Sequence, residues 1–126
     1  MPELTGSAPV LLVADVEKAA AYYRDALGFQ FDRFWGDPPS FCMPHRDGLI
    51  VMLSQVPAGQ PVDTESRIAD HVWNAYFWVD DARALHDEFV AKGATIDQGL
   101  IEKPYEILEF TIRDLDGHCI GIGQPI

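Results

Sequence analysis

One order of predicted elements occurs twice in this chain of 126 residues, and this repeat limits the possible folds more than any other feature. In each half an apolar, strand-like run precedes a helical pattern, and further strand-like runs follow it. Acids that can cap a first turn and glycines that can end a last one mark the helices, namely Asp15 with Gly28, and Asp80 or Asp81 with Gly93. Because a chain of this length buries one core rather than two, both units must pack as a single domain, with the helices on one face of the sheets.

The spacing of apolar residues sets the boundaries of the two units. Unit one covers about residues 6–55 and unit two about residues 71–124. The polar connector over 56–70 could join the two units, or it could lie over a binding site. The expected elements are, in order, a strand over 10–13, a helix over 16–27, strands over 29–34, 41–43 and 49–55, a strand over 72–79, a helix over 82–92, and strands over 95–97, 105–113 and 118–123.

The chain is acidic, with 20 Asp and Glu residues against 9 Lys and Arg and a formal net charge of −11 at pH 7. A field of that sign repels phosphate backbones and anionic lipid headgroups, so we expect neither a nucleic-acid partner nor a membrane partner. The same field attracts a cationic ligand. The alternative is that the acids only keep the protein soluble.

Cysteine content and hydropathy predict the compartment. Cys42 and Cys119 are too few for a disulfide scaffold and show no C-x-x-C spacing, so a reducing cytoplasm is expected. Residues 1–8 have neither the basic nor the apolar region of a secretory signal. No apolar run approaches the roughly 20 residues that span a bilayer.

Two segments carry a family resemblance. DVEKAAAYYRDALGF (residues 15–29) resembles the opening signature of the vicinal-oxygen-chelate superfamily, and PYEILEFTIRDLDGHCIGIGQ (residues 104–124) is similar to its closing pattern. That superfamily includes glyoxalase I, extradiol dioxygenases, and fosfomycin- and bleomycin-resistance proteins. The resemblance implies an α+β fold of two β-α-β-β-β modules, a cup-shaped mixed sheet with helices on its outer face, and a homodimer. The chain departs from the pattern at Glu106, where a glycine is common, and at Leu115, where a proline is usual.

The resemblance also implies where a metal would bind, because metal-dependent members take His, Gln or Glu ligands from the first and last strands of each module. The corresponding positions here are Ala8, Met52, Asn74 and Gly121. Alanine and glycine carry no side-chain donor, a thioether suits hard divalent cations poorly, and one neutral amide binds weakly. We therefore expect no metal and no other cofactor.

Four histidines offer an alternative metal site, and none of them is spaced from another as H-x-H or H-x-x-x-H. They are His45, His71, His86 and His118. His71 lies three residues before Asn74, so it would enter the cup only if the strand register were shifted. Surface or turn positions are the expectation for all four.

Alternation along the strands predicts the lining of the cup. If Asn74 faces the cup, Tyr76 and Trp78 face it too, and the resemblance adds Glu109 as a cup-facing acid. The predicted ligand-binding residues are Trp35, Phe41, Met52, Asn74, Tyr76, Trp78, Tyr105 and Glu109. Such an aromatic lining suits a flat organic ligand. Alternatively, the rings only fill the cup or a dimer seam.

Glu109 is the predicted catalytic candidate. In an apolar cup its carboxylate could act as a general base or as the counter-charge of a cationic ligand. Otherwise the carboxylate is bonded to a neighbouring strand or to an arginine such as Arg33 or Arg113.

Three functions remain open at this level. The preferred hypothesis is a metal-free protein similar to the bleomycin-resistance branch, which binds a flat, cationic small molecule without turnover. The alternative is a glyoxalase-like lyase or a dioxygenase with non-standard metal ligands. A third hypothesis is a structural or regulatory dimer whose cup is occluded.

Overall fold

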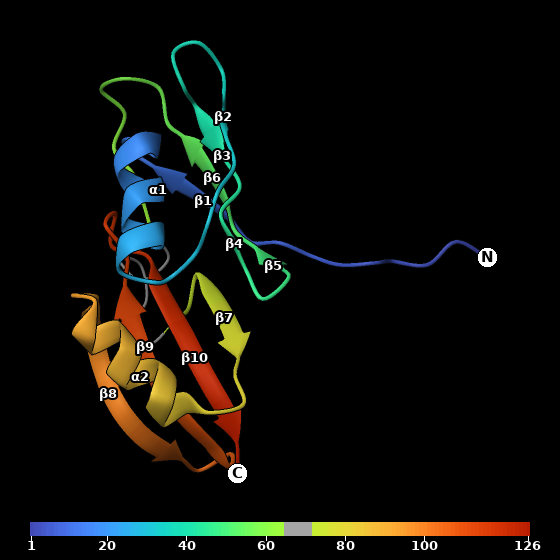
Figure 1. The fold of residues 1–126 in the computed structure, drawn as a ribbon, viewed down its shortest axis with the longest axis vertical. Coiled ribbons are helices and arrows are strands. Elements are labelled where there is room, and N and C mark those ends of the chain that lie inside the picture. Colours follow the sequence, from blue (N-terminus) through green and yellow to red (C-terminus); the bar gives the residue numbers. More distant parts are fainter. Residues whose placement is uncertain (65–71) are drawn as a thin grey trace.

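The computed structural model describes residues 1–64 and 72–126, and these ranges form ten strands and two helices arranged in two stacked halves (Figure 1). The helices α1 (Val16–Asp25) and α2 (Ala82–Ala91) lie on the same side of the molecule, and the N-terminal segment leads away from its body. The predicted α+β class with two modules of like order is confirmed. Residues 65–71, which include His71 and part of the predicted connector, lie outside the described ranges.

The first module is built on a four-stranded sheet with the strand order β1-β6-β3-β2, in which β1 and β6 run parallel. Its strands are β1 (Val10–Val13), β2 (Phe34–Trp35), β3 (Phe41–Cys42) and β6 (Met52–Gln55). A separate hairpin pairs β4 (His45–Arg46) with β5 (Leu49–Ile50). The strand predicted over 49–55 is therefore divided between hairpin and sheet. A tight turn causes this division. Asp47 and Gly48 both have positive φ, and the turn they form lets β5 pair with β4.

The second module is built on a sheet with the order β7-β10-β9-β8. Its strands are β7 (Ala75–Trp78), β8 (Thr95–Lys103), β9 (Ile107–Arg113) and β10 (Cys119–Pro125). The strand predicted over 95–97 was too short, because pairing with β9 extends β8 to Lys103 through two irregularities of register. The polar residues and Gly99 in this stretch break the alternation of apolar and polar residues that predicts a strand. The pairing with β9 therefore decides its conformation.

Both helices begin in the same way. Asp15 accepts hydrogen bonds from the amides of Glu17 and Lys18, and Asp81, not Asp80, accepts one from Ala84. The first helical amide of each helix donates to a glutamine near the end of its own module's sheet. Val16 N donates to Gln55 Oε1 at 2.9 Å, and Ala82 N donates to Gln124 Oε1 at 2.8 Å. The repeat seen in the sequence thus extends to the contacts that join helix and sheet.

One buried tyrosine links the two modules. Tyr23 of α1 is buried in the core, and its hydroxyl donates to Asp114 Oδ2 of the second module at 2.8 Å. Burial, together with the nearby Asp114 carboxylate, holds the pKa of Tyr23 well above its usual value, so the hydroxyl keeps its proton. The other oxygen of Asp114 accepts from the amides of Asp116 and His118, which shape the turn before β10.

Replacing Tyr23 with phenylalanine is expected to lower the free energy of unfolding by about 1–2 kcal/mol, because it leaves one oxygen of the buried Asp114 carboxylate without its donor. Urea denaturation followed by circular dichroism measures the change. The control is R24Q, which breaks an exposed ion pair with Asp25 and should cost well under 1 kcal/mol. Equal losses in the two variants would contradict a stabilising role for the Tyr23–Asp114 hydrogen bond.

An ion pair joins the β4–β5 hairpin to α2. Arg46 Nη1 and Nη2 lie 2.6 and 3.0 Å from the two carboxylate oxygens of Glu88, and Arg46 Nη1 also donates to the carbonyl of Leu27 at 2.8 Å. Lys92 follows Glu88 by one helical turn, and its Nζ lies 3.2 Å from Glu88 Oε2. The Arg46 guanidinium, and to a smaller degree Lys92, hold the pKa of Glu88 below its usual value against the opposing effect of burial.

The variant E88Q is expected to lose about 1 kcal/mol of stability at neutral pH, a small value because a third of the Glu88 side chain is exposed and solvent screens the pair. Since the pKa of Glu88 is lowered by folding, its contribution is present above the unfolded-state value of 4.5 and is lost as the pH falls below it. Urea denaturation at several pH values should show the wild-type and E88Q curves converging in acid. D87N, at an exposed neighbour, should show no such convergence.

Candidate functional site

One face of the second sheet gathers the aromatic residues predicted for the cup. Strand pairing sets Tyr76 beside Gly121 and Trp78 beside Gly123, and Gly123 beside Glu109. The ring of Tyr76 lies 4.7 Å from that of Trp73 and 5.0 Å from that of Trp78, measured between centroids. We call Trp73, Tyr76, Trp78 and Tyr105 the aromatic face. It is open, since Trp78 is 62% exposed and Tyr105 is about half exposed.

Two glycines of β10 form the floor of the aromatic face. A Cβ added at Gly121 would lie 2.5 Å from Tyr76 Cδ2 and 2.7 Å from Trp73 Cδ1. A Cβ added at Gly123 would overlap the Tyr76 hydroxyl and lie 2.8 Å from Ile107 Cγ2. The rings of Tyr76 and Trp73 therefore approach the strand this closely only because neither position carries a side chain.

Glu109 lies beneath these rings and is 1% exposed. The hydroxyls of Tyr76 and Tyr105 both donate to its Oε1 at 2.9 Å, and Lys103 Nζ lies 3.8 Å from its Oε2. The carboxylate is thus held by two phenols and an ammonium group, which is how a buried charge is stabilised. Of the two arginines considered as partners, Arg113 lies 3.2 Å from Asp97 and Arg33 stacks over Trp35.

Folding raises the pKa of both phenols that contact Glu109. Burial, then the hydrogen bond to Glu109, raises the pKa of Tyr105 to about 12. The same causes, in the same order, raise the pKa of Tyr76 well above its usual value. Both hydroxyls are therefore donors to the carboxylate, and their bonds fix the orientation of two rings of the aromatic face.

The structure places Asn74 differently from the alternation count. The chain bends at this residue, and Asn74 Oδ1 accepts a hydrogen bond from the amide of Cys119 at 3.0 Å. The preceding residue, Trp73, contacts Tyr76 instead. Sequence reasoning missed Trp73 because, in a regular strand over 72–79, Trp73 and Tyr76 would point to opposite faces of the sheet. A usable signal was the pair Gly121 and Gly123, which leaves room on one face for rings from the neighbouring strand.

The remaining predicted residues lie on the sheet of the first module. Trp35 pairs with Phe41 across β2 and β3, and their ring centroids are 5.9 Å apart. Met52 begins β6 and pairs with Val10 of β1, which is 60% exposed. The predicted site therefore divides into two groups, one around Glu109 and one around Phe41, on two sheets that lie in different halves of the molecule (Figure 1).

A cavity of about 410 Å³ adjoins the aromatic face. Tyr76 and Trp78 line it from β7, Leu49 and Ile50 from the β4–β5 hairpin, and Pro9 from the segment before β1. Its volume falls within the range of about 300–1,000 Å³ that is usual for small-molecule sites.

The residues at the family's metal positions do not fit a metal ion. Ala8 and Gly121 have no donor, the rings of Tyr76 and Trp73 occupy the space over Gly121, and the Asn74 oxygen is bonded to a backbone amide. Within residues 1–64 and 72–126, His, Cys, Asp and Glu form no group of three that could hold a metal.

The histidines lie apart from the aromatic face. His45 belongs to the β4–β5 hairpin and His86 lies 3.1 Å from Asp87 on α2. His118 is buried, with Nε2 2.7 Å from the Leu12 carbonyl. His45 and His86 are partly exposed, in agreement with the predicted surface or turn positions. His118 directly follows the turn before β10, but it is buried and links the two modules.

The repeated modules define an α+β protein of the glyoxalase-like class. The model of the Glyoxalase/Bleomycin resistance protein/Dioxygenase superfamily matches residues 7–122, nearly the whole chain. The chain belongs to this superfamily.

Solved structures of the same fold include both binding proteins and enzymes. The chain is similar to the bleomycin-binding protein of bleomycin-producing Streptomyces verticillus, complexed with copper(II)-bleomycin, at 26% identity and a TM-score of 0.75 over 100% of both chains. It is similar in fold to TioX from Micromonospora sp. ML1, with 23% identity, a TM-score of 0.73, and 96% and 100% of the two chains covered. It is also similar in fold to lactoylglutathione lyase from Agrobacterium tumefaciens, with 19% identity and a TM-score of 0.71, and 98% and 96% of the two chains are covered. No curated protein sequence matches the chain. Since one fold carries such different functions, function must be argued from the site.

Neither helix within the described ranges is long and apolar enough to cross a bilayer.

Proposed function

We propose that this protein binds a flat, cationic organic molecule on the aromatic face, without a metal and without turnover. The observation that carries the proposal is an open set of indole and phenol rings fixed over a buried carboxylate. Aromatic rings stack on flat ligands and attract cations to their faces. The formal net charge of −11 adds long-range attraction for a cation. The similarity to the Streptomyces verticillus protein, whose structure holds copper(II)-bleomycin, supports an organic ligand of this kind.

In this proposal Glu109 positions the rings, and it is not a general base. Both phenol hydroxyls donate to one of its oxygens and Lys103 lies near the other, so the carboxylate is engaged before any ligand arrives. A general base instead needs an oxygen within hydrogen-bond reach of the substrate proton.

We further propose that the chain acts as a homodimer in the cytoplasm. Val10 and Leu12 on the first sheet and Trp78 on the second leave two open apolar faces, which a second copy is suited to cover. The group formed by Trp35, Phe41 and Met52 would then line the ligand site from the first sheet. The buried, free thiols of Cys42 and Cys119 support a reducing compartment. Sedimentation equilibrium of the purified chain tests the dimer, and a monomer at all concentrations would contradict it.

Calorimetric titration with metal-free bleomycin tests the ligand class. We expect saturable binding, and we expect W78A to weaken it about tenfold by removing a stacking surface. The matched control is L115A, which truncates an exposed side chain in the turn before β10 and should bind like the wild type. No heat and no tryptophan quenching at high micromolar ligand would overturn the proposal.

Elemental analysis tests the metal-free part separately. Protein purified without chelator should carry far less than one equivalent of manganese, iron, nickel, cobalt or zinc. A stoichiometric metal would favour the lyase or dioxygenase alternative, even though the positions expected for ligands carry no suitable donor set.

A further inference from the structure

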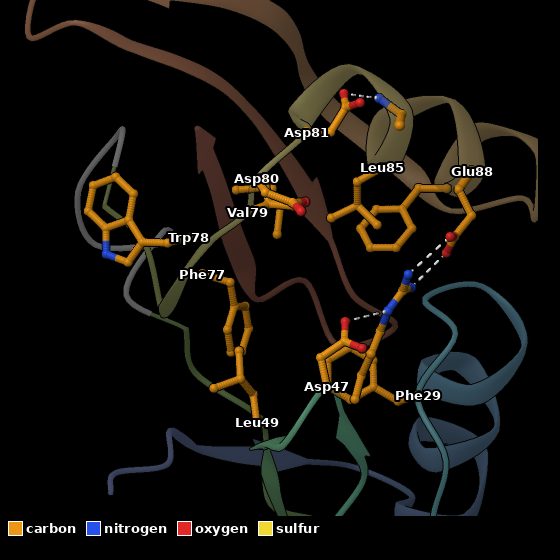
Figure 2. Close-up of a pocket in the computed structure, with 14 residues that line it drawn as sticks. Phe29, Asp47, Leu49, Phe77, Trp78, Val79, Asp80, Asp81, Leu85 and Glu88 are labelled. Carbon is orange, nitrogen blue, oxygen red and sulfur yellow. Dashed lines mark hydrogen bonds and ion pairs between the residues drawn. The ribbon is translucent and has the colours of Figure 1, made fainter. Parts of the chain in front are cut away.

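A second cavity, of about 250 Å³, lies between the modules beside α2 (Figure 2). The apolar part of its wall is formed by Phe29 of the first module and by Phe77, Leu85 and Phe89 of the second. Phe77 points away from the aromatic face, because it alternates with Tyr76 along β7. Leu49, Phe77 and Trp78 line both cavities, so the two adjoin. Phe29 and the α2 residues line only the second cavity.

Acidic groups gather at this second cavity. Asp47, Asp80, Asp81 and Glu88 line it, against one cationic residue, Arg46. Figure 2 shows Asp80 and Asp47 on opposite sides of the space bounded by Phe77 and Leu85. Asp81 caps α2 through Ala84 N, and Glu88 is held by Arg46 at 2.6 Å. Asp47 meets Arg46 only at 3.6 Å, so Asp47 and Asp80 are the acids best placed to meet a ligand.

The one arginine at the cavity does not make it an anion site. Both terminal nitrogens of Arg46 bind Glu88, one of them also binds the Leu27 carbonyl, and Nε lies 3.6 Å from Asp47. The guanidinium charge is thus already matched within the protein. The acids that remain give the cavity an excess of negative charge.

We propose that this cavity binds a small organic ammonium ion, with its apolar body between Phe29, Phe77 and Leu85 and its cationic group between Asp47 and Asp80. Phe29, Phe77 and Leu85 suit an organic body, and the acids disfavour a carboxylate. The volume suits a single ring with a short chain, since a cavity of about 150 Å³ already holds benzene. This site goes beyond the proposed function, because its acids do not line the cavity at the aromatic face and it takes a smaller ligand.

Titration of the ¹⁵N-labelled protein with 2-phenylethylamine tests the proposal, with amide chemical shifts as the readout. We expect saturable shifts at Ala84, Leu85 and Phe89 at millimolar ligand. 2-Phenylethanol and 3-phenylpropionate have the same ring without a positive charge. They should bind at least about fivefold more weakly, which is the difference in affinity that one exposed charge pair contributes. Tryptophan fluorescence is unsuitable because Trp78 borders both cavities.

Variants separate filling of the cavity from loss of charge. A84W should abolish the shifts, because residue 84 lines the cavity from an exposed position of α2 where a ring can be added without entering the core. D80N and D47N should each weaken amine binding two- to fivefold and leave the alcohol unaffected, as expected for partly exposed charge pairs of about 0.5–1 kcal/mol. Asparagine tolerates the positive φ of residue 47, so D47N keeps the turn. D87N, on the same helix outside the cavity, is the control.

Three results would overturn the proposal. The first is the absence of shifts at α2 with the amine at millimolar concentration. The second is equal binding of amine and alcohol, which would remove the role of the acids. The third is amine shifts confined to Trp73, Tyr76 and Tyr105, which would assign the cation to the aromatic face. Bleomycin titration of A84W keeps the two sites distinguishable, since residue 84 does not line the cavity at the aromatic face.

Discussion

Replacing Gly123 with alanine is expected to lower the free energy of unfolding by about 2 kcal/mol, the usual scale of overpacking. The added methyl group would overlap the Tyr76 hydroxyl and press on Ile107 Cγ2 at 2.8 Å. Ile107 is buried in β9, so the Tyr76 ring must move, and its hydrogen bond to Glu109 is then lost. Urea denaturation measures the stability. The same variant should weaken bleomycin binding, because the displaced Tyr76 ring changes the shape of the aromatic face.

The matched control for this substitution is Gly99 of β8. A Cβ added there meets no atom within 4 Å, and the residue does not need a positive φ. G99A is expected to leave stability within about 0.5 kcal/mol of the wild type or to raise it, because alanine restricts the unfolded chain. Equal destabilisation by G123A and G99A would show that loss of glycine in a strand, and not contact with Tyr76, causes the effect.

Replacing Glu109 with glutamine is expected to lower stability by about 2 kcal/mol, because two phenol donors lose a charged acceptor and Lys103 loses its counter-charge. The shape of the side chain is kept, so the loss reports charge and not a cavity. The pKa of Tyr105 should fall from about 12 part of the way toward its ordinary value, and the pKa of Tyr76 should fall as well. Both stay raised in part, since burial is the larger cause.

This variant also changes the dependence of stability on alkaline pH. Folding raises the pKa of Tyr76 and Tyr105, so their contribution is fully present below their ordinary value of 10.0 and is lost as the pH rises toward about 12. The wild type should therefore lose more stability than E109Q over that range. Phenolate absorbance and urea denaturation at matched pH values measure the two effects.

Y105F is the control for the Glu109 substitution. It removes the hydroxyl of the more exposed ring and leaves Tyr76 bonded to Glu109, so the pKa of Tyr76 should stay raised. If the phenols of E109Q titrate as those of the wild type do, the carboxylate does not act on them and its positioning role is wrong.

Local signals predicted the helices well. Asp15 caps α1, Gly28 and Gly93 have positive φ after the two helices, and each apolar stripe faces the core. Caps and helical periodicity depend on residues within a few positions of one another, so the sequence contains them directly. The choice between Asp80 and Asp81 needed the structure, because either acid can reach a free amide of the first turn.

Long-range pairing limited the rest of the prediction. The length of β8 depends on β9, and the division of residues 49–55 depends on the hairpin with β4. The departure from the family pattern at Glu106 has a local consequence that is visible only in three dimensions, since Glu106 adopts the positive φ of 64° that a glycine would adopt freely.

The sequence by itself determined the two-module α+β fold and the aromatic character of the candidate site, because a short repeat with alternating rings leaves few other arrangements. It also excluded suitable donors from the family's metal positions. Only the tertiary structure decided that Tyr76 and Tyr105 hold Glu109, that Trp73 replaces Asn74 on the aromatic face, and that a second, acidic cavity lies beside α2. The physical reason is that these contacts join residues from different strands and modules, and their geometry follows from packing and not from local spacing.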